Sequence, residues 1–188
     1  MRLILLLRVD LKKDKKRVRP QSSFEWRGIV KKIKYLVMDV DGTLTDGKIY
    51  MGAEGEIMKA FDIKDGCGIH DLLPKANITP IIITGRKSKI LENRCKEIGI
   101  SELYQGVKDK TGKLTEILGK EKFSCVAYVG DDINDLACME KVRAENGIIG
   151  CPADAAKQVK KIADYVSSRN GGNGAVREFI EWLVECYS

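Results

Sequence analysis

Histidine is nearly absent from this chain of 188 residues, since His70 is the only one. A Ser-His-Asp triad needs a histidine as its general base, and catalytic zinc sites commonly take several histidines as ligands. The six cysteines do not replace them, because they are scattered along the chain and form no C-x-x-C pair. The sequence therefore has few residues with which to build a catalytic triad or a zinc site, and we expect His70 to be a surface or packing residue.

Long apolar runs are also missing. No stretch approaches the roughly 18 apolar residues of a membrane span. The first apolar run, Leu3–Leu7, is shorter than the roughly 7–15 residues of a signal-peptide core, and no small-residue cleavage site follows it. We therefore expect a cytoplasmic protein with reduced cysteines and no stable membrane association.

Positive charge is concentrated at the front of the chain. Residues 1–35 contain 12 Lys/Arg and 3 Asp/Glu, a balance of +9, so the net charge of +6 leaves −3 for residues 36–188. We predict a basic, flexible arm at residues 1–30 and a single domain at residues 31–188. A start codon assigned too early is an alternative for the arm. Because the domain itself is mildly acidic, we expect no nucleic-acid partner; the alternative, an arm that binds nucleic acid or an anionic membrane, is testable by deleting residues 1–25.

Strands alternate with helices along the domain, which predicts an α/β fold with a Rossmann-like parallel sheet sandwiched by helices. Buried strands are expected at residues 34–39, 79–85 and 124–132, and shorter ones at 102–106, 147–149 and 164–166. Helices are expected at 67–77, where Pro74 should kink or end the helix, then at 87–98, 110–118, from 134, at 155–162 and at 175–186. Residues 48–51 and 56–62 flank "GAEG" and predict a projecting β-hairpin.

Polar side chains follow three of the predicted buried strands. Asp39, Thr84 and Asp131 stand at their carboxyl ends, where α/β sheets bind ligands. Asp41 follows Asp39 by two residues, so alternation along a strand would lean the two carboxylates the same way. Clustered carboxylates can share Mg²⁺, which prefers oxygen ligands and substrate phosphate.

These residues can divide the work of phosphoryl transfer. A carboxylate such as Asp39 can attack phosphorus and form an aspartyl-phosphate. Asp41 can then protonate the leaving oxygen and later deprotonate the attacking water. Thr84 can donate a hydrogen bond to a phosphoryl oxygen, and Lys110 can neutralise charge on the transferring group.

Four motifs in order, "DVDGTLTDG", "IIITGR", the lysine of "QGVKDK" and "GDDINDL", resemble those of the haloacid dehalogenase superfamily of phosphohydrolases. The resemblance runs from about residue 33 to residue 183. It implies that Asp39 is the nucleophile and a metal ligand, and that Asp41 is the general acid/base and ligates Mg²⁺ through its backbone carbonyl. It implies Asp131 as the third metal ligand and Thr84 as a phosphoryl-binding residue. The presence of Asp41 favours phosphate-ester hydrolysis over carbon–halogen cleavage.

The same resemblance implies that Lys110 holds the phosphoryl group, although Lys108 and Lys113 are neighbouring alternatives. Asp132 and Asp135 resemble residues that position this lysine or a metal-bound water. An acidic cluster of this kind can also be no more than a solvated helix start.

The spacing of the motifs leaves no room for a cap domain, because 42 residues separate Asp41 from Thr84 and 25 separate Thr84 from Lys110. A capless chain with "DGTLTDGKIY", "FDIKDGCGI" and "GGNGAVREF" resembles the 3-deoxy-D-manno-octulosonate 8-phosphate phosphatases. It is also similar to the related phosphatases of 9-phosphorylated nonulosonates. The resemblance implies a small phosphorylated sugar acid as substrate. It also implies a homotetramer assembled by the hairpins, in which a neighbour's tail covers each site.

The substrate-binding residues implied by the resemblance are Gly85, Arg86, Gly172, Asn173 and Arg177. Arg86 can bind a substrate carboxylate bidentately or simply sit at a helix start. Arg177 can reach a neighbour's ligand or pair with Glu181 at helical i,i+4 spacing. Asn173 stands where many relatives carry arginine, and Pro74 is a second departure, which leaves the sugar specificity open. A non-catalytic tetramerisation module of sugar-nucleotide synthesis is the remaining alternative.

Overall fold

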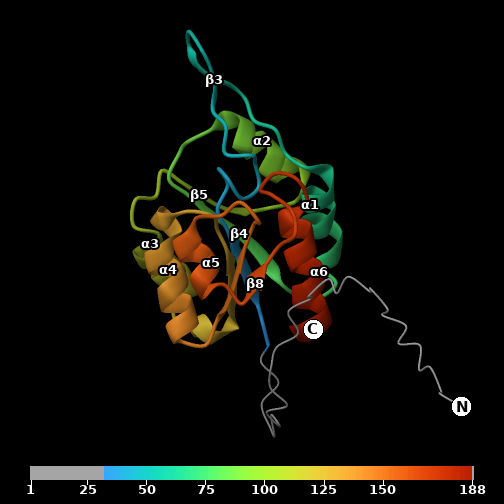
Figure 1. The fold of residues 1–188 in the computed structure, drawn as a ribbon, viewed down its shortest axis with the longest axis vertical. Helices are drawn as coiled ribbons and strands as arrows, with labels where there is room; N and C mark the ends of the chain where they lie inside the picture. The colour runs from blue at the N-terminus through green and yellow to red at the C-terminus, as the bar shows by residue number, and fades with distance from the viewer. Residues whose placement is uncertain (1–31, 188) are drawn as a thin grey trace, which may run out of the picture.

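A computed structural model of the chain describes residues 32–187 (Figure 1), so the predicted basic arm lies outside the described residues. A sheet of six parallel strands runs through the centre in the order β5-β4-β1-β6-β7-β8. The strands are β1 Tyr35–Met38, β4 Thr79–Thr84, β5 Glu102–Gln105, β6 Val126–Val129, β7 Ile148–Cys151 and β8 Tyr165–Val166. The α/β class and the parallel sheet predicted from the sequence are confirmed. Since β1 pairs with both β4 and β6, the strand order reverses at β1, which makes its carboxyl end the expected ligand site.

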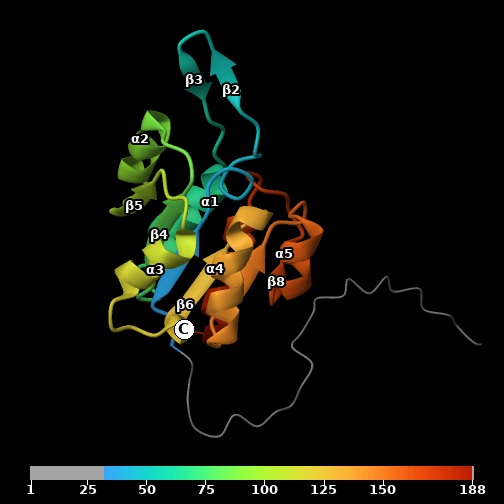
Figure 2. The ribbon, with the colours of Figure 1, turned by 90° about the vertical axis from the view of Figure 1, so that its left-hand side faces the viewer.

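Helices cover both faces of the sheet (Figures 1 and 2). One face is covered by α1 Ile63–Cys67 with the following π-helical turn η1 Gly68–Leu72, α2 Lys89–Glu97 and α6 Ala175–Tyr187. The other is covered by α3 Lys110–Leu118, α4 Ile133–Ala144 and α5 Lys157–Ile162, and a 3-10 turn, η2 Phe123–Cys125, leads into β6. Alternation along β1 buries Leu36 and Met38 in the first core and Val37 in the second. Strands buried on both faces explain the unbroken apolar runs in the sequence.

Some predicted boundaries were wrong. The helix expected to start at residue 67 begins at Ile63, because the Asp62 side chain accepts a hydrogen bond from the Lys64 amide at 2.6 Å and caps it there. The helical segment ends before Pro74, as expected. The strand expected at residues 124–132 covers only β6, because the 3-10 turn η2 precedes it and its pairing with β1 stops at Val129.

The C-terminal helix α6 is attached to α1 through the buried carboxylate of Asp65. Its Oδ1 accepts a hydrogen bond of 2.7 Å from the amide of Arg177, in the first turn of α6. Burial raises the pKa of Asp65 to about 6, although backbone hydrogen bonds from the start of α6 oppose that effect. Tyr165 of β8 stacks on Trp182 of α6 with ring centroids 5.0 Å apart. These contacts fix the Gly-rich segment that precedes α6.

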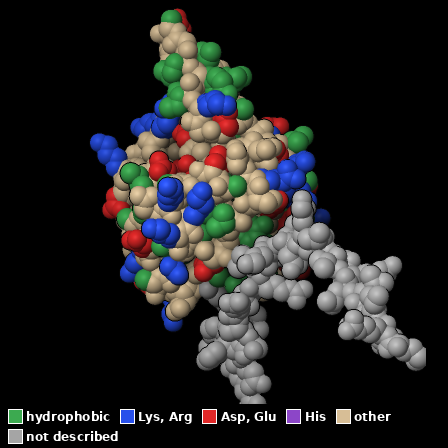
Figure 3. All heavy atoms as spheres, viewed as in Figure 1, with side chains coloured by type: hydrophobic (Ala, Val, Ile, Leu, Met, Phe, Trp, Pro, Cys, Tyr) green, Lys and Arg blue, Asp and Glu red, His purple; other side chains and the backbone are tan. Residues whose placement is uncertain are grey.

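A two-stranded antiparallel hairpin, β2 Tyr50–Gly52 and β3 Gly55–Met58, projects from the body (Figures 1 and 2). The strand expected at residues 56–62 is shorter, because its partner β2 ends the ladder at the pair Tyr50–Met58. Hydrophobic side chains gather on the hairpin surface (Figure 3). The large exposed ones are Ile49, Met51, Ile57 and Met58. Within the described residues, no helix has both the length and the apolar character needed to cross a membrane.

Candidate active site

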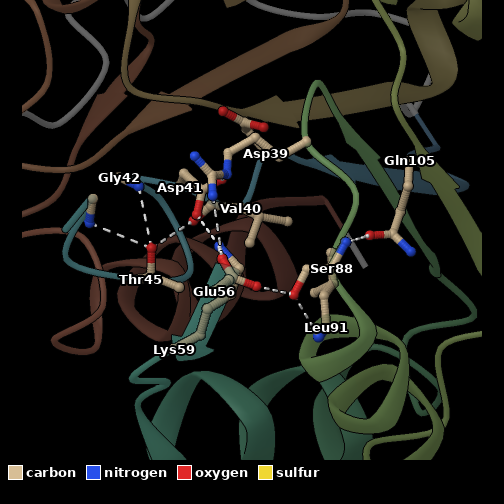
Figure 4. A network of polar contacts seen from close by, with 12 residues as sticks. Asp39, Val40, Asp41, Gly42, Thr45, Glu56, Lys59, Ser88, Leu91 and Gln105 are labelled. Atoms are coloured by element: carbon tan, nitrogen blue, oxygen red, sulfur yellow. Dashed lines mark hydrogen bonds and ion pairs between the residues drawn. The ribbon is translucent and has the colours of Figure 1, made fainter. Parts of the chain in front are cut away.

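The loop after β1 carries the first two predicted site residues. β1 ends at Met38, and the carbonyl of Val40 accepts the amides of Thr43, Leu44 and Thr45 in a tight turn. Strand alternation therefore does not extend over Asp39 and Asp41. Their carboxylates have separate partners: Lys110 pairs with Asp39, and Lys59 pairs with Asp41 (Figure 4).

Asp39 lies in a buried ion-pair network. The ammonium of Lys110 is 2.8 Å from Asp39 Oδ1 and 2.7 Å from Asp135 Oδ1, and the Tyr128 hydroxyl donates to Asp135 Oδ1 at 2.8 Å. Burial and the nearby charge of Asp135 raise the pKa of Asp39 to about 6. Burial would lower the pKa of Lys110, but Asp39 and Asp135 together raise it. Lys110 is therefore a fixed cation beside the predicted nucleophile.

Asp131 approaches the same place from the loop after β6. Its Oδ1 accepts a hydrogen bond of 2.9 Å from the Thr43 hydroxyl. It also packs against Gly42, where an added Cβ would stand 2.0 Å from Asp131 Oδ2 and where φ is +95°. Only glycine fits both the conformation and the space. Burial raises the pKa of Asp131 to about 7.

Oxygen atoms of Asp39, Asp131 and Asp135 lie within 4.8 Å of one another. Lys110 pairs with Asp39 and Asp135, and the pKa values of Asp39 and Asp131 are raised, so the three carboxylates together have negative charge that a further cation would offset. An all-oxygen donor set fits Mg²⁺. The residues present therefore fit a magnesium site, with Asp39 and Asp131 as the predicted carboxylate ligands.

The Asp41 carboxylate lies in a second network, at the base of the hairpin (Figure 4). Lys59 forms an ion pair with Asp41 Oδ1 and lies 3.1 Å from Glu56 Oε1. Arg86 is more distant, with Nε 3.7 Å from Asp41 Oδ2, and the Ser88 hydroxyl donates to Glu56. Arg86 also contacts Glu56, with Nη2 3.5 Å from Oε1.

Sequence reasoning missed Lys59, Glu56 and Ser88. A glutamate and a lysine three residues apart at the end of a hairpin are common on solvated surfaces, so the pattern has no distinctive signal. Tyr128 was missed as well, although a tyrosine inside a buried apolar strand requires a hydrogen-bond partner.

Three further predicted residues lie at the end of β4 and in the loop after it. Thr84 is the buried last residue of β4, and its carbonyl accepts the amide of Val107 at 3.0 Å. Gly85 is exposed and follows it. The Arg86 side chain is 40% exposed, its Nη2 donates to Glu56 Oε1 at 3.5 Å, and its Nε is buried without a hydrogen-bond partner.

The Gly-rich segment, residues 170–174, lies directly against the turn after β1 of its own chain. The amide of Gly172 donates to the carbonyl of Thr43 at 3.1 Å. A Cβ on Gly171 would stand 1.9 Å from the carbonyl oxygen of Gly42. Asn173 is exposed, and its amide donates to a carbonyl within the segment. The segment therefore supports the loop that carries Asp41.

The remaining predicted residues have the following contacts within the chain. Arg177 pairs with Glu181, with Nε 2.7 Å from Oε1. Asp132 caps α4, where it forms a capping box with Asp135. His70 is exposed beside Asp71. All six cysteines are free.

Known proteins are similar to this chain in both sequence and fold. The 3-deoxy-D-manno-octulosonate 8-phosphate phosphatase of Salmonella typhi is 47% identical over 154 residues, which cover 81% of this chain and 79% of that protein. The phosphatase of the same name from Yersinia pestis is 42% identical over 156 residues, covering 81% and 80%. The chain belongs to this family of haloacid dehalogenase-like phosphatases. No family model matches the sequence.

Solved structures agree with the family. The crystal structure of the Yersinia pestis phosphatase matches with a TM-score of 0.77 and 41% identity, covering 84% of both chains. The phosphatase of Moraxella catarrhalis, solved in complex with magnesium ion, phosphate ion and a KDO molecule, matches with a TM-score of 0.76 and 39% identity. That match covers 84% of this chain and 88% of the other.

Proposed function

We propose that this chain is a Mg²⁺-dependent phosphatase that hydrolyses 3-deoxy-D-manno-octulosonate 8-phosphate through an aspartyl-phosphate intermediate. The observation that carries the proposal is the buried Asp39 carboxylate, paired with Lys110 at 2.8 Å beside two further carboxylates. A nucleophile, a fixed cation and a magnesium-type donor set are thus gathered at the carboxyl end of β1. The choice of substrate comes from the similar proteins, which are 3-deoxy-D-manno-octulosonate 8-phosphate phosphatases.

The chain's residues divide the reaction into two displacements. The Asp39 carboxylate attacks phosphorus, the bond to the sugar oxygen breaks, and Asp41 gives its proton to that oxygen. Asp41 then takes a proton from water, which attacks the same phosphorus and releases Asp39 and inorganic phosphate. Lys110 and the Thr84 hydroxyl hold the phosphoryl oxygens throughout. Mg²⁺, held by Asp39, Asp131 and the Asp41 carbonyl, would supply charge neutralisation for the phosphoryl group.

Arg86 supports a substrate that bears a carboxylate. Its side chain is 40% exposed beside Asp41, and arginine binds carboxylates in two parallel hydrogen bonds. A 9-phosphorylated nonulosonate carries the same carboxylate and remains the second candidate. The first is preferred because the relatives described above are phosphatases of the eight-carbon acid.

A phosphate-release screen tests the proposal. We expect 3-deoxy-D-manno-octulosonate 8-phosphate to give the highest kcat/KM among phosphorylated eight- and nine-carbon keto acids, simple sugar phosphates and nucleotides. Activity should vanish in EDTA and return with Mg²⁺, and zinc should not be required. A preferred nine-carbon substrate would move the chain to the second candidate, and full turnover in chelator would remove the metal. A folded protein inactive on every substrate would support the non-catalytic module.

The hairpin is proposed to assemble a homotetramer. Support comes from its exposed apolar side chains, since Met51 and Ile57 are 59% and 66% exposed, and such patches mark interaction sites. Replacing Ile57 and Met58 with Lys should produce a folded monomer in sedimentation velocity, whereas Lys replacing the exposed Ile133 of α4 should not. A hairpin variant that remains a tetramer would place the interface elsewhere.

A further inference from the structure

Lys59 is a buried cation next to the predicted general acid/base. Its side chain is only 3% exposed, and its ammonium contacts Asp41 Oδ1 and Glu56 Oε1. Lysine is rarely buried unless its charge is paired, because removing the charge from water is costly. Both of its ion-pair partners are carboxylates, and one of them, Asp41, has a role in the proposed reaction.

Glu56 anchors this lysine to the body of the domain. The Ser88 hydroxyl donates to Glu56, and the same hydroxyl accepts the amide of Leu91 at 3.2 Å at the start of α2. The amide of Ser88 donates to the Gln105 side chain at 2.6 Å. Lys59 is therefore held by a group that is itself tied to α2 and β5 (Figure 4).

We propose that Lys59 is a positioning residue for Asp41: it holds the Asp41 carboxylate on the leaving-group side of the site, while Glu56 and Ser88 fix Lys59. Without this ion pair the Asp41 carboxylate could rotate toward Arg86 or toward the metal group around Asp39. A small misalignment of a group that transfers a proton strongly lowers the rate of the chemical step. The inference rests on the proposed function, because Asp41 must be the acid/base for its orientation to matter.

Arg86 does not share this role. It contacts Glu56 Oε1 through Nη2 at 3.5 Å, but its closest atom is 3.7 Å from Asp41 and its side chain is 40% exposed. The Lys59 side chain is almost fully enclosed. The two cations are therefore assigned different work: Lys59 orients Asp41, and Arg86 remains available to the substrate carboxylate.

The test is a double-mutant cycle on Lys59→Met and Asp41→Asn, with an unactivated alkyl phosphate and with p-nitrophenyl phosphate. Lys59→Met should lower kcat on the alkyl phosphate by about 10–100-fold and change KM less than about threefold. In the Asp41→Asn background the same change should cost less than about threefold, because the group it orients is already disabled. Lys59→Arg should recover part of the loss. Lys48→Met is the matched control, since Lys48 is 73% exposed and pairs with Asp46, and it should be unchanged.

Two outcomes would overturn the assignment of Lys59 as a positioning residue. Equal losses in both backgrounds would show that Lys59 acts independently of Asp41. A change confined to KM would make it a substrate-binding residue. If Lys59→Met does not fold by circular dichroism, Glu56→Gln replaces it in the cycle and should give a smaller, equally non-additive loss. A wild-type protein inactive on both phosphates and also on 3-deoxy-D-manno-octulosonate 8-phosphate would instead refute the proposed function.

Discussion

Asp39→Asn should leave a folded protein with no measurable turnover, a loss in kcat of about 10⁴-fold or more. The amide keeps the size of the carboxylate but cannot form an acyl phosphate. Lys110 retains Asp135 at 2.7 Å as a partner, and the substitution removes a buried carboxylate whose pKa is raised to about 6. The thermal midpoint in metal-free buffer should therefore fall little or not at all.

Phosphate release and thermal unfolding, measured on the same preparation, check this result. Asp71→Asn is the matched control, because Asp71 is an exposed carboxylate that pairs with His70, and its kcat should equal that of the wild type. Substantial turnover by Asp39→Asn would contradict the aspartyl-phosphate mechanism. A collapse of the thermal midpoint would show that Asp39 is needed for the fold.

The sheet was predictable because its strands are buried on both faces, so their sequences are unbroken apolar runs. The grouping of Asp39 with Asp131 followed from the same reasoning, since carboxyl ends of parallel strands meet at one edge. The start of α1 was missed for a local reason. The Asp62 side chain caps this helix, so it begins four residues earlier than the apolar pattern indicated.

Lys59 shows the limit most clearly. Nothing in "EIMKAFD" distinguishes a lysine that returns to the site from one that faces water. Its direction depends on where the hairpin ladder ends, at Met58, and on the anchored Glu56. The Gly-rich segment is similar: the resemblance implies that Gly172 and Asn173 bind substrate, and only the fold shows that the segment packs on the turn after β1.

Gly171→Ala should damage both stability and catalysis through that packing. The new Cβ would stand 1.9 Å from the carbonyl oxygen of Gly42 and 3.0 Å from that of Thr45. Both are backbone atoms, so no rotamer change can relieve the overlap, and the Gly-rich segment must separate from the turn that carries Asp41. We expect a cost of about 2–3 kcal/mol, or roughly 4–12 °C in the thermal midpoint. We also expect a loss of about 10–100-fold in kcat for protein that remains folded at the assay temperature.

Gly119→Ala supplies the comparison. Gly119 ends α3 with φ of +55° and has no atom within 4 Å of an added Cβ, so the change should cost about 1 kcal/mol of backbone strain and leave kcat unaltered. A Gly171→Ala protein that loses stability with normal kcat would limit the Gly-rich segment to a structural role. Loss of both stability and kcat, with Gly119→Ala active, would mean that the turn after β1 needs the Gly-rich segment to hold Asp41 in place. The C-terminal segment of each chain would then contribute to its own active site, whatever a neighbouring subunit adds.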